Sequence, residues 1–112
     1  MSYHGADKVV DHYNLMGPVK AALESSVRYL ANELGERDIR VFAVSPGPLR
    51  TRAASGIDHF DELIDKAVTR SPGRRLVDIA EVGRVVAFLV SGATSGMTGD
   101  VIYVDAGLHI MA

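Results

Sequence analysis

Two short apolar runs, 39–44 and 101–104, constrain the fold of this chain more than any other feature. IRVFAV shows no polar alternation after Arg40, and VIYV contains only β-branched and aromatic residues. A strand without alternation is buried on both faces, as in a parallel sheet covered by helices. Because helical patterns separate the two runs, we predict parallel pairing through a right-handed crossover.

The segment from residue 15 to 34 is predicted to be a helix. Pro18 is tolerated only in a first turn, so the helix should begin close to Gly17, and Gly35 is a natural residue to end it. Apolar residues recur every three or four positions, which predicts one buried stripe. The stripe consists of Val19, Leu23, Val27, Leu30 and Leu34.

Two shorter helices are predicted between the strands. Residues 57–67 form an amphipathic pattern, and Asp78 with Glu81 makes a capping box that starts a second helix. The buried stripe of that second helix is expected to be Val82, Val85, Val86 and Leu89. Residues 1–12 and 45–56 are predicted to be loops.

The fold class is therefore α/β, and residues 1–112 form a single segment without repeats or an internal boundary. Two strands alone do not make a stable parallel sheet. We therefore expect a partial Rossmann-type fold, a doubly wound parallel sheet of which this chain supplies part.

Composition excludes several kinds of function. The formal net charge of −2 argues against a general nucleic-acid binder, and the chain contains no cysteine. The longest strongly apolar run, VVAFLV, is too short to span a bilayer, and the amino terminus lacks the apolar core of a signal peptide. The four histidines show no metal-ligand spacing. We therefore predict a cytoplasmic protein with no nucleic-acid, membrane or metal partner.

The stretch YNLMGPVK contains the first candidate site, because it places Tyr13 and Lys20 seven residues apart. In a helix this spacing corresponds to about 700° of rotation, so both side chains would share a face if the helix reached back to Tyr13. With Tyr13 just ahead of the first turn, its ring can still lean over the same side. A lysine near a phenol lowers the phenol's pKa, and such a phenol can donate a proton to a reacting oxygen. A surface tyrosine near a surface lysine is the alternative.

SPGPLRT, which follows the first strand, is the second candidate site. A loop at the carboxyl end of a parallel strand lies where open α/β sheets bind ligands. Gly47 allows a ligand to approach the backbone closely. Pro46 and Pro48, on either side of it, restrict the backbone. Arg50 and Thr51 are suited to phosphate oxygens. A plain connecting loop is the alternative.

Three segments of the sequence, taken together, resemble a known superfamily. They are YHGADKVVDHYNLMGPVKAALESSVRYLANELG, then IRVFAVSPGPLRTRAASGI, then EVGRVVAFLVSGATSGMTGDVIYVDAG. They resemble the carboxyl-terminal part of a short-chain dehydrogenase/reductase. The usual motif of that superfamily is Tyr-x-x-x-Lys. Tyr13-x6-Lys20, with Tyr3 ten residues upstream, is similar to the bacterial enoyl-acyl-carrier-protein reductases.

The resemblance implies reduction of the trans-2 double bond of an enoyl thioester by NADH or NADPH in fatty-acid biosynthesis. Tyr13 would hydrogen-bond the thioester carbonyl, Lys20 would hold the nicotinamide ribose, and Tyr3 would line the substrate pocket. The main chain of Leu49 would meet the carboxamide, and Thr51 the diphosphate. The whole cofactor loop would consist of Gly47, Pro48, Leu49, Arg50, Thr51, Arg52 and Ala53.

The resemblance also implies partners. The substrate would be an enoyl-acyl-carrier protein or enoyl-CoA, and the chain would form a homo-oligomer through the helix over 13–34. Because the family's amino-terminal dinucleotide-binding half is missing from these 112 residues, we expect a fragment that is inactive alone. The alternative is a non-catalytic oligomerisation module derived from that fold. A related reductase acting on carbonyls is disfavoured by the x6 spacing and the paired tyrosines.

Overall fold

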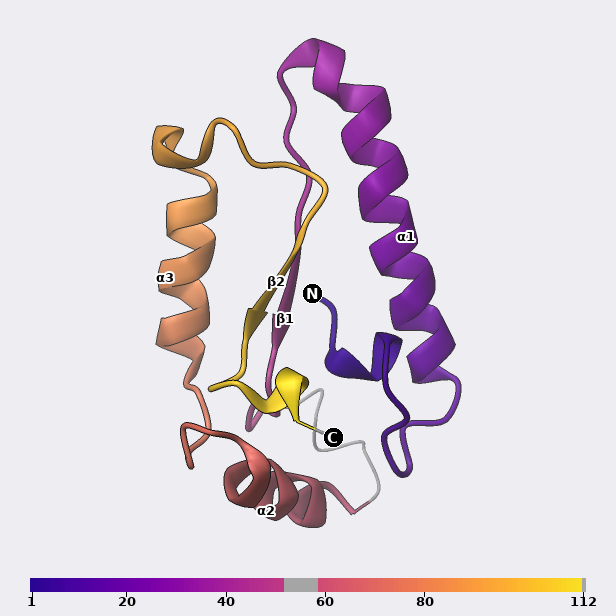
Figure 1. The fold of residues 1–112 in the computed structure, drawn as a ribbon, viewed down its shortest axis with the longest axis vertical. Coiled ribbons are helices and arrows are strands. Elements are labelled where there is room, and N and C mark those ends of the chain that lie inside the picture. Colours follow the sequence, from indigo (N-terminus) through magenta and orange to yellow (C-terminus); the bar gives the residue numbers. More distant parts are fainter. Residues whose placement is uncertain (52–58, 112) are drawn as a thin grey trace.

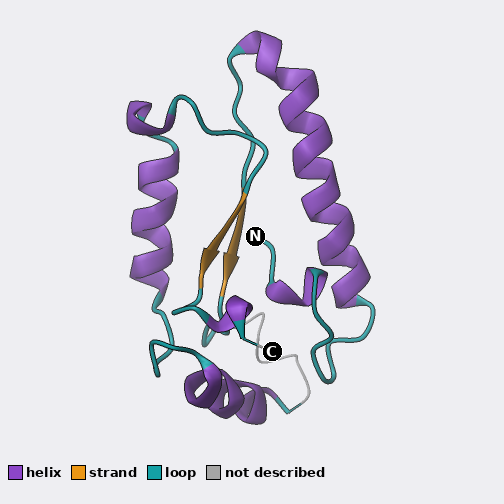
Figure 2. Cartoon of the chain, in the orientation of Figure 1, coloured by secondary structure: helices purple, strands orange, loops and turns teal. Residues whose placement is uncertain are grey.

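A computed structural model of the chain describes residues 1–51 and 59–111. The three helices are α1 (Met16–Leu34), α2 (Phe60–Arg70) and α3 (Ile79–Leu89), and the two strands are β1 (Ala43–Pro46) and β2 (Val101–Val104). Short 3-10 turns are formed by η1 (His4–Ala6), η2 (Gly35–Arg37), η4 (Gly92–Thr94) and η5 (Leu108–Ile110). In Figures 1 and 2, α1 and α3 flank the strand pair, and α2 lies across its lower end.

The two strands pair in parallel, with Ala43 opposite Val101 and Pro46 opposite Val104. This confirms the predicted α/β class and pairing, but the first strand is shifted along the chain from the predicted 39–44. The reason lies at Val41, whose amide donates to the Thr98 hydroxyl at 3.0 Å. A side chain therefore takes the position of a ladder partner, and regular pairing begins two residues later.

Helix α1 begins at Met16, so Pro18 lies in its first turn, as predicted. Its end differs from the prediction, because Gly35 keeps a right-handed φ of −59° and the chain continues into η2. The left-handed residue is Asp38, with a φ of 56°. Aspartate tolerates this conformation better than most residues, so the chain reverses three positions later than the glycine suggested.

The capping box of α3 is confirmed. The Asp78 carboxylate accepts from the Glu81 amide at 2.7 Å, and the Glu81 carboxylate accepts from the Asp78 amide at 2.9 Å. Two further bonds from Arg75 hold the pKa of Glu81 at about 2. Helix α2 extends beyond the predicted 57–67 to Arg70 at its carboxyl end, and positions 57 and 58 lie outside the described residues.

The core lies between α3 and the sheet, where Val44, Val77, Val82 and Leu89 are buried together. The stripe predicted for α1 is mostly wrong, since only its Val27 is buried, together with Ala31. A 19-residue helix is about 28 Å long, whereas a four-residue strand covers about 13 Å. Most of the apolar face of α1 therefore extends beyond the sheet and is exposed.

The first residues of the chain run beside β1 and carry Tyr3 to the site. The Ser2 amide donates to the Val44 carbonyl at 2.7 Å, and the backbone of Tyr3 is extended. η1 then turns the chain toward the start of α1 (Figure 1). None of the helices described here is long and apolar enough to cross a membrane.

Candidate active site

Tyr3 and Tyr13 are brought together in the structure. Both are buried, with ring centroids 5.0 Å apart and planes tilted by 59°, a favourable aromatic arrangement. Gly5 makes the contact feasible, because a Cβ there would lie 2.7 Å from Cδ1 of Tyr13. The sequence motif contained both tyrosines, but the glycine that lets them meet was not singled out.

The backbone fixes Tyr13 just ahead of α1. Its amide donates to the Val10 carbonyl at 3.2 Å, and its carbonyl accepts from the Met16 amide at 3.0 Å. The neighbours on both sides, His12 and Asn14, have left-handed backbones, with φ of 61° and 47°. Such conformations outside glycine are uncommon and cluster at functional sites. The tyrosine is thus held in a short, tightly turned segment.

The electrostatics of the pair differ from the sequence-based prediction. Burial raises the pKa of Tyr13, and burial together with Tyr13 and Asp105 raises the pKa of Tyr3. The expected lowering of the Tyr13 pKa by Lys20 is wrong, because the Lys20 ammonium instead donates to the Met1 carbonyl at 3.0 Å. Both phenols therefore stay protonated at neutral pH and are suited to donating hydrogen bonds.

Asp105, directly after β2, organises the residues beside the tyrosines. Its buried carboxylate accepts from the amides of Gly107 and His109 at 3.0 and 2.8 Å, and contacts His109 Nδ1 at 3.0 Å. The His109 ring stacks on Tyr103 at 3.9 Å. Sequence reasoning missed this cluster. The available signal was an aspartate two residues before a glycine at the carboxyl end of a strand.

The loop after β1 lies at the carboxyl edge of the sheet, as predicted. Gly47 and Pro48 are buried, and a Cβ on Gly47 would lie 3.2 Å from Cβ of Asp105. The Leu49 side chain packs against the core. Arg50 lies 3.7 Å from the Asp61 carboxylate, in an exposed ion pair. Thr51 is partly buried.

Two members of the predicted cofactor loop, Arg52 and Ala53, lie outside the described residues. The roles assigned to the remaining members, and to Lys20, stay predictions.

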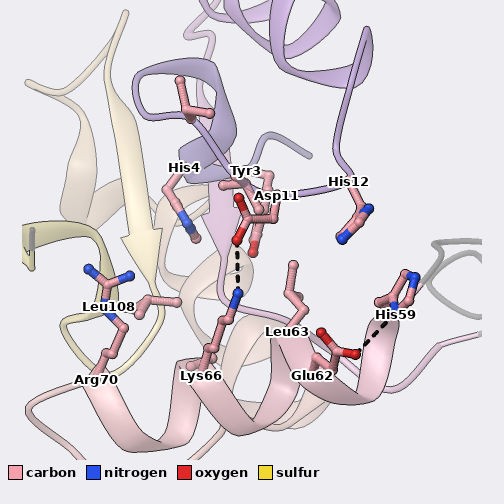
Figure 3. Close-up of a pocket in the computed structure, with 13 residues that line it drawn as sticks. Tyr3, His4, Asp11, His12, His59, Glu62, Leu63, Lys66, Arg70 and Leu108 are labelled. Atoms are coloured by element: carbon pink, nitrogen blue, oxygen red, sulfur yellow. Dashed lines mark hydrogen bonds and ion pairs between the residues drawn. The ribbon is translucent and has the colours of Figure 1, made fainter.

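A cavity of about 240 Å³ lies beside Tyr3, between residues 3–12 and α2 (Figure 3). Two contacts join its walls. Lys66 donates to Asp11 at 2.8 Å, and the His12 and His59 rings stack at 4.5 Å. The lining residues are Tyr3, His4, Val9, Val10, Asp11, His12, His59, Glu62, Leu63, Lys66, Ala67, Arg70 and Leu108.

Comparisons with known proteins identify the family to which the chain belongs. Residues 1–109 match the family model described as enoyl-(acyl carrier protein) reductase. The chain is 51% identical over 109 residues to enoyl-[acyl-carrier-protein] reductase [NADH] 1 of Rhizobium meliloti, covering 97% of this chain and 40% of that protein. It is 46% identical over 112 residues to enoyl-[acyl-carrier-protein] reductase [NADH] FabI of Escherichia coli, covering all of this chain and 43% of that protein.

A solved structure has the same backbone fold. The Bacillus cereus enoyl-acyl carrier protein reductase, crystallised with NADP+ and an indole naphthyridinone, superposes with a TM-score of 0.95 at 46% identity. The match covers 99% of this chain and 43% of the other. The fold is thus that of the Rossmann-like α/β class. Within it, the chain belongs to the enoyl-(acyl carrier protein) reductase family, and spans about two fifths of the length of the curated relatives it matches.

Proposed function

We propose that this chain is the carboxyl-terminal part of an enoyl-acyl-carrier-protein reductase of fatty-acid biosynthesis, acting in the cytoplasm. The reaction would reduce the trans-2 double bond of an enoyl thioester carried on acyl-carrier protein or coenzyme A. The observation that carries the proposal is the buried contact between Tyr3 and Tyr13 at the carboxyl edge of a parallel sheet. The curated relatives named for this activity with NADH support it.

Tyr13 is the proposed hydrogen-bond donor to the thioester carbonyl. When a hydride adds to the far carbon of the double bond, negative charge develops on that oxygen. A protonated phenol in a site of low polarity stabilises this charge more strongly than water does. Burial raises the Tyr13 pKa, so the donor proton is retained at neutral pH. The Tyr3 ring packs against the Tyr13 ring and lines the adjacent cavity.

The residues at this edge of the sheet fit a nicotinamide dinucleotide, and NADH is the proposed cofactor because the relatives' names specify it. When bound, it supplies the hydride. The main chain around Leu49, the hydroxyl of Thr51 and the amine of Lys20 offer donors for its amide, phosphate and ribose oxygens. Lys20 reaches the Met1 carbonyl at 3.0 Å, so a ribose hydroxyl would replace or share a weak, exposed bond.

A chimera tests the proposal. The segment of the Rhizobium meliloti relative that this chain matches is replaced by the chain itself. We expect the chimera to oxidise NADH with a crotonyl thioester. The 112 residues alone should show no measurable turnover, because positioning the nicotinamide draws on binding energy from the rest of the dinucleotide. A folded but inactive chimera would contradict the proposal and favour the assembly-module alternative.

We also propose that the chain forms a homo-oligomer through α1. Its outer face exposes Val19 and Tyr29, with 54% and 70% of their surface accessible, and Leu15, just before its first residue, is 78% accessible. Between them, Ala22, Ser25 and Ser26 line a shallow groove with Tyr29 and Leu30. Small side chains of this kind let a second helix approach closely.

Light scattering at micromolar concentration should give a dimer or a larger species. Ala22→Glu should reduce its mass, because a charge in the groove is costly to bury. Arg37→Glu, outside the groove, is the control. A monodisperse wild-type monomer would contradict this proposal.

A further inference from the structure

The lining of the cavity beside Tyr3 mixes apolar side chains with ionisable ones. More than half of its lining side chains are ionisable, and they come from both walls. A saturated acyl chain gains free energy from contact with apolar side chains. It would also remove water from charged side chains without replacing their hydrogen bonds, which costs free energy. The cavity therefore fits a ligand that combines polar groups with apolar stretches.

The charged side chains of the cavity differ in whether they have a hydrogen-bond or ion-pair partner. The Lys66 ammonium is paired with Asp11 at 2.8 Å, and the His59 ring contacts Glu62 at 3.0 Å. The side chain of Arg70, in the last turn of α2, forms no hydrogen bond or ion pair with any other described residue. Among the described lining residues, its guanidinium is therefore available to a ligand.

His4 faces Arg70 across the cavity. Figure 3 shows the His4 ring pointing from the upper wall toward α2, and the Lys66 and Arg70 side chains rising from α2 toward it. Nδ1 of His4 is buried and has no hydrogen-bond partner among the described residues. Burial is the main cause that lowers the pKa of His4; Asp105 opposes this shift, and the positive charges of Lys8 and Arg70 add to it. A neutral imidazole with an unused nitrogen thus lies opposite an unpaired guanidinium.

We infer that this cavity receives the phosphate-bearing pantetheine arm of the acyl thioester, with Arg70 binding its phosphate and His4 hydrogen-bonding a polar group of the arm. The inference rests on the proposed function, which places the thioester carbonyl at Tyr13. An arm of amides and a hydroxyl ending in a phosphate matches a lining of both polar and apolar side chains. The same arm is common to acyl-carrier protein and coenzyme A, so both proposed substrates present it.

A structural role for Arg70 is the competing explanation. A cation in the last turn of a helix interacts favourably with the helix dipole. That role predicts a loss of stability on substitution, with no dependence on the ligand's phosphate. Binding measurements with and without the phosphate therefore separate the two explanations.

The test compares S-crotonyl-4′-phosphopantetheine with S-crotonylpantetheine by calorimetric titration of the folded chimera described above, without NADH. We expect the phosphorylated compound to bind about three- to tenfold more tightly at low ionic strength, because the bond to Arg70 is charge-assisted but partly exposed. Arg70→Gln should remove this preference, and Arg70→Lys should keep part of it. Arg37→Gln, which removes the same charge near the far end of α1, is the matched control and should keep all of it.

Equal affinity for the two compounds, or no detectable binding of either, would overturn the inference. So would an equal effect of Arg70→Gln and Arg37→Gln. Affinity that follows acyl chain length instead of the phosphate would identify the cavity as the acyl pocket. The titration contains no hydride donor, so it is independent of turnover. An active chimera without a phosphate preference would leave the proposed function standing and remove only the inference.

Discussion

Replacing Tyr13 by phenylalanine is expected to lower the kcat of the chimeric reductase by about 10²- to 10³-fold. The substitution removes one hydroxyl, which is the donor proposed to stabilise the developing negative charge. Because the ring remains, its contact with Tyr3 at 5.0 Å and the local fold should persist. Steady-state kinetics with varied crotonyl thioester measures kcat, and urea unfolding checks that stability is unchanged.

Lys20→Ala in the same chimera provides the contrast. Its amine is proposed to hold the ribose, so its loss should mainly raise the KM for NADH and change kcat less. Arg37→Ala is a control, because it removes a cation in η2, outside the proposed cofactor contacts and outside the cavity. If Tyr13→Phe and Lys20→Ala both left kcat and KM unchanged, the assignment of the site would be wrong.

Gly5→Ala is expected to separate the two tyrosines. The added Cβ would lie 2.7 and 2.9 Å from two ring atoms of Tyr13, closer than packed atoms approach. Either the ring or the backbone of η1 must move, at a cost of about 1–3 kcal/mol in the free energy of unfolding. Because the displaced ring carries the proposed donor, the activity of the chimera should fall as well.

Gly83→Ala is the control for that substitution. Gly83 lies in the middle of α3, and a Cβ added there would meet no described atom within 4 Å. Alanine should therefore stabilise the chain by up to about 1 kcal/mol. Urea unfolding of Gly5→Ala, Gly83→Ala and the parent measures the change in the free energy of unfolding for each substitution. A Gly5→Ala variant as stable and as active as the parent would show that the tyrosine contact tolerates displacement.

Much of the fold could be predicted from the sequence because it depends on local chemistry. The parallel pairing of Ala43–Pro46 with Val101–Val104 follows from two apolar runs without alternation. The capping box at Asp78 and Glu81 involves groups three residues apart. The tyrosine motif likewise placed Tyr3 and Tyr13 in one site, although not in contact.

Other features depended on residues far apart in the chain, and only the tertiary structure decided them. Lys20 and Tyr13 share a motif, yet the ammonium bonds to the first residue of the chain, so burial alone sets the direction of the Tyr13 pKa shift. The cavity joins α2 to residues 3–12 through the pair of Lys66 and Asp11, 55 positions apart.

The apolar stripe of α1 also separates what the sequence determines from what the tertiary structure decides. Its 3.6-residue period determined which side chains share a face, because that depends only on helix geometry. Whether the face is buried depends on the area of sheet beneath it, which here is two four-residue strands. The sequence by itself thus determined the elements, their pairing and the motif. The tertiary structure decided which faces are covered and which charged groups meet, because burial and electrostatic contact are properties of the whole packed chain.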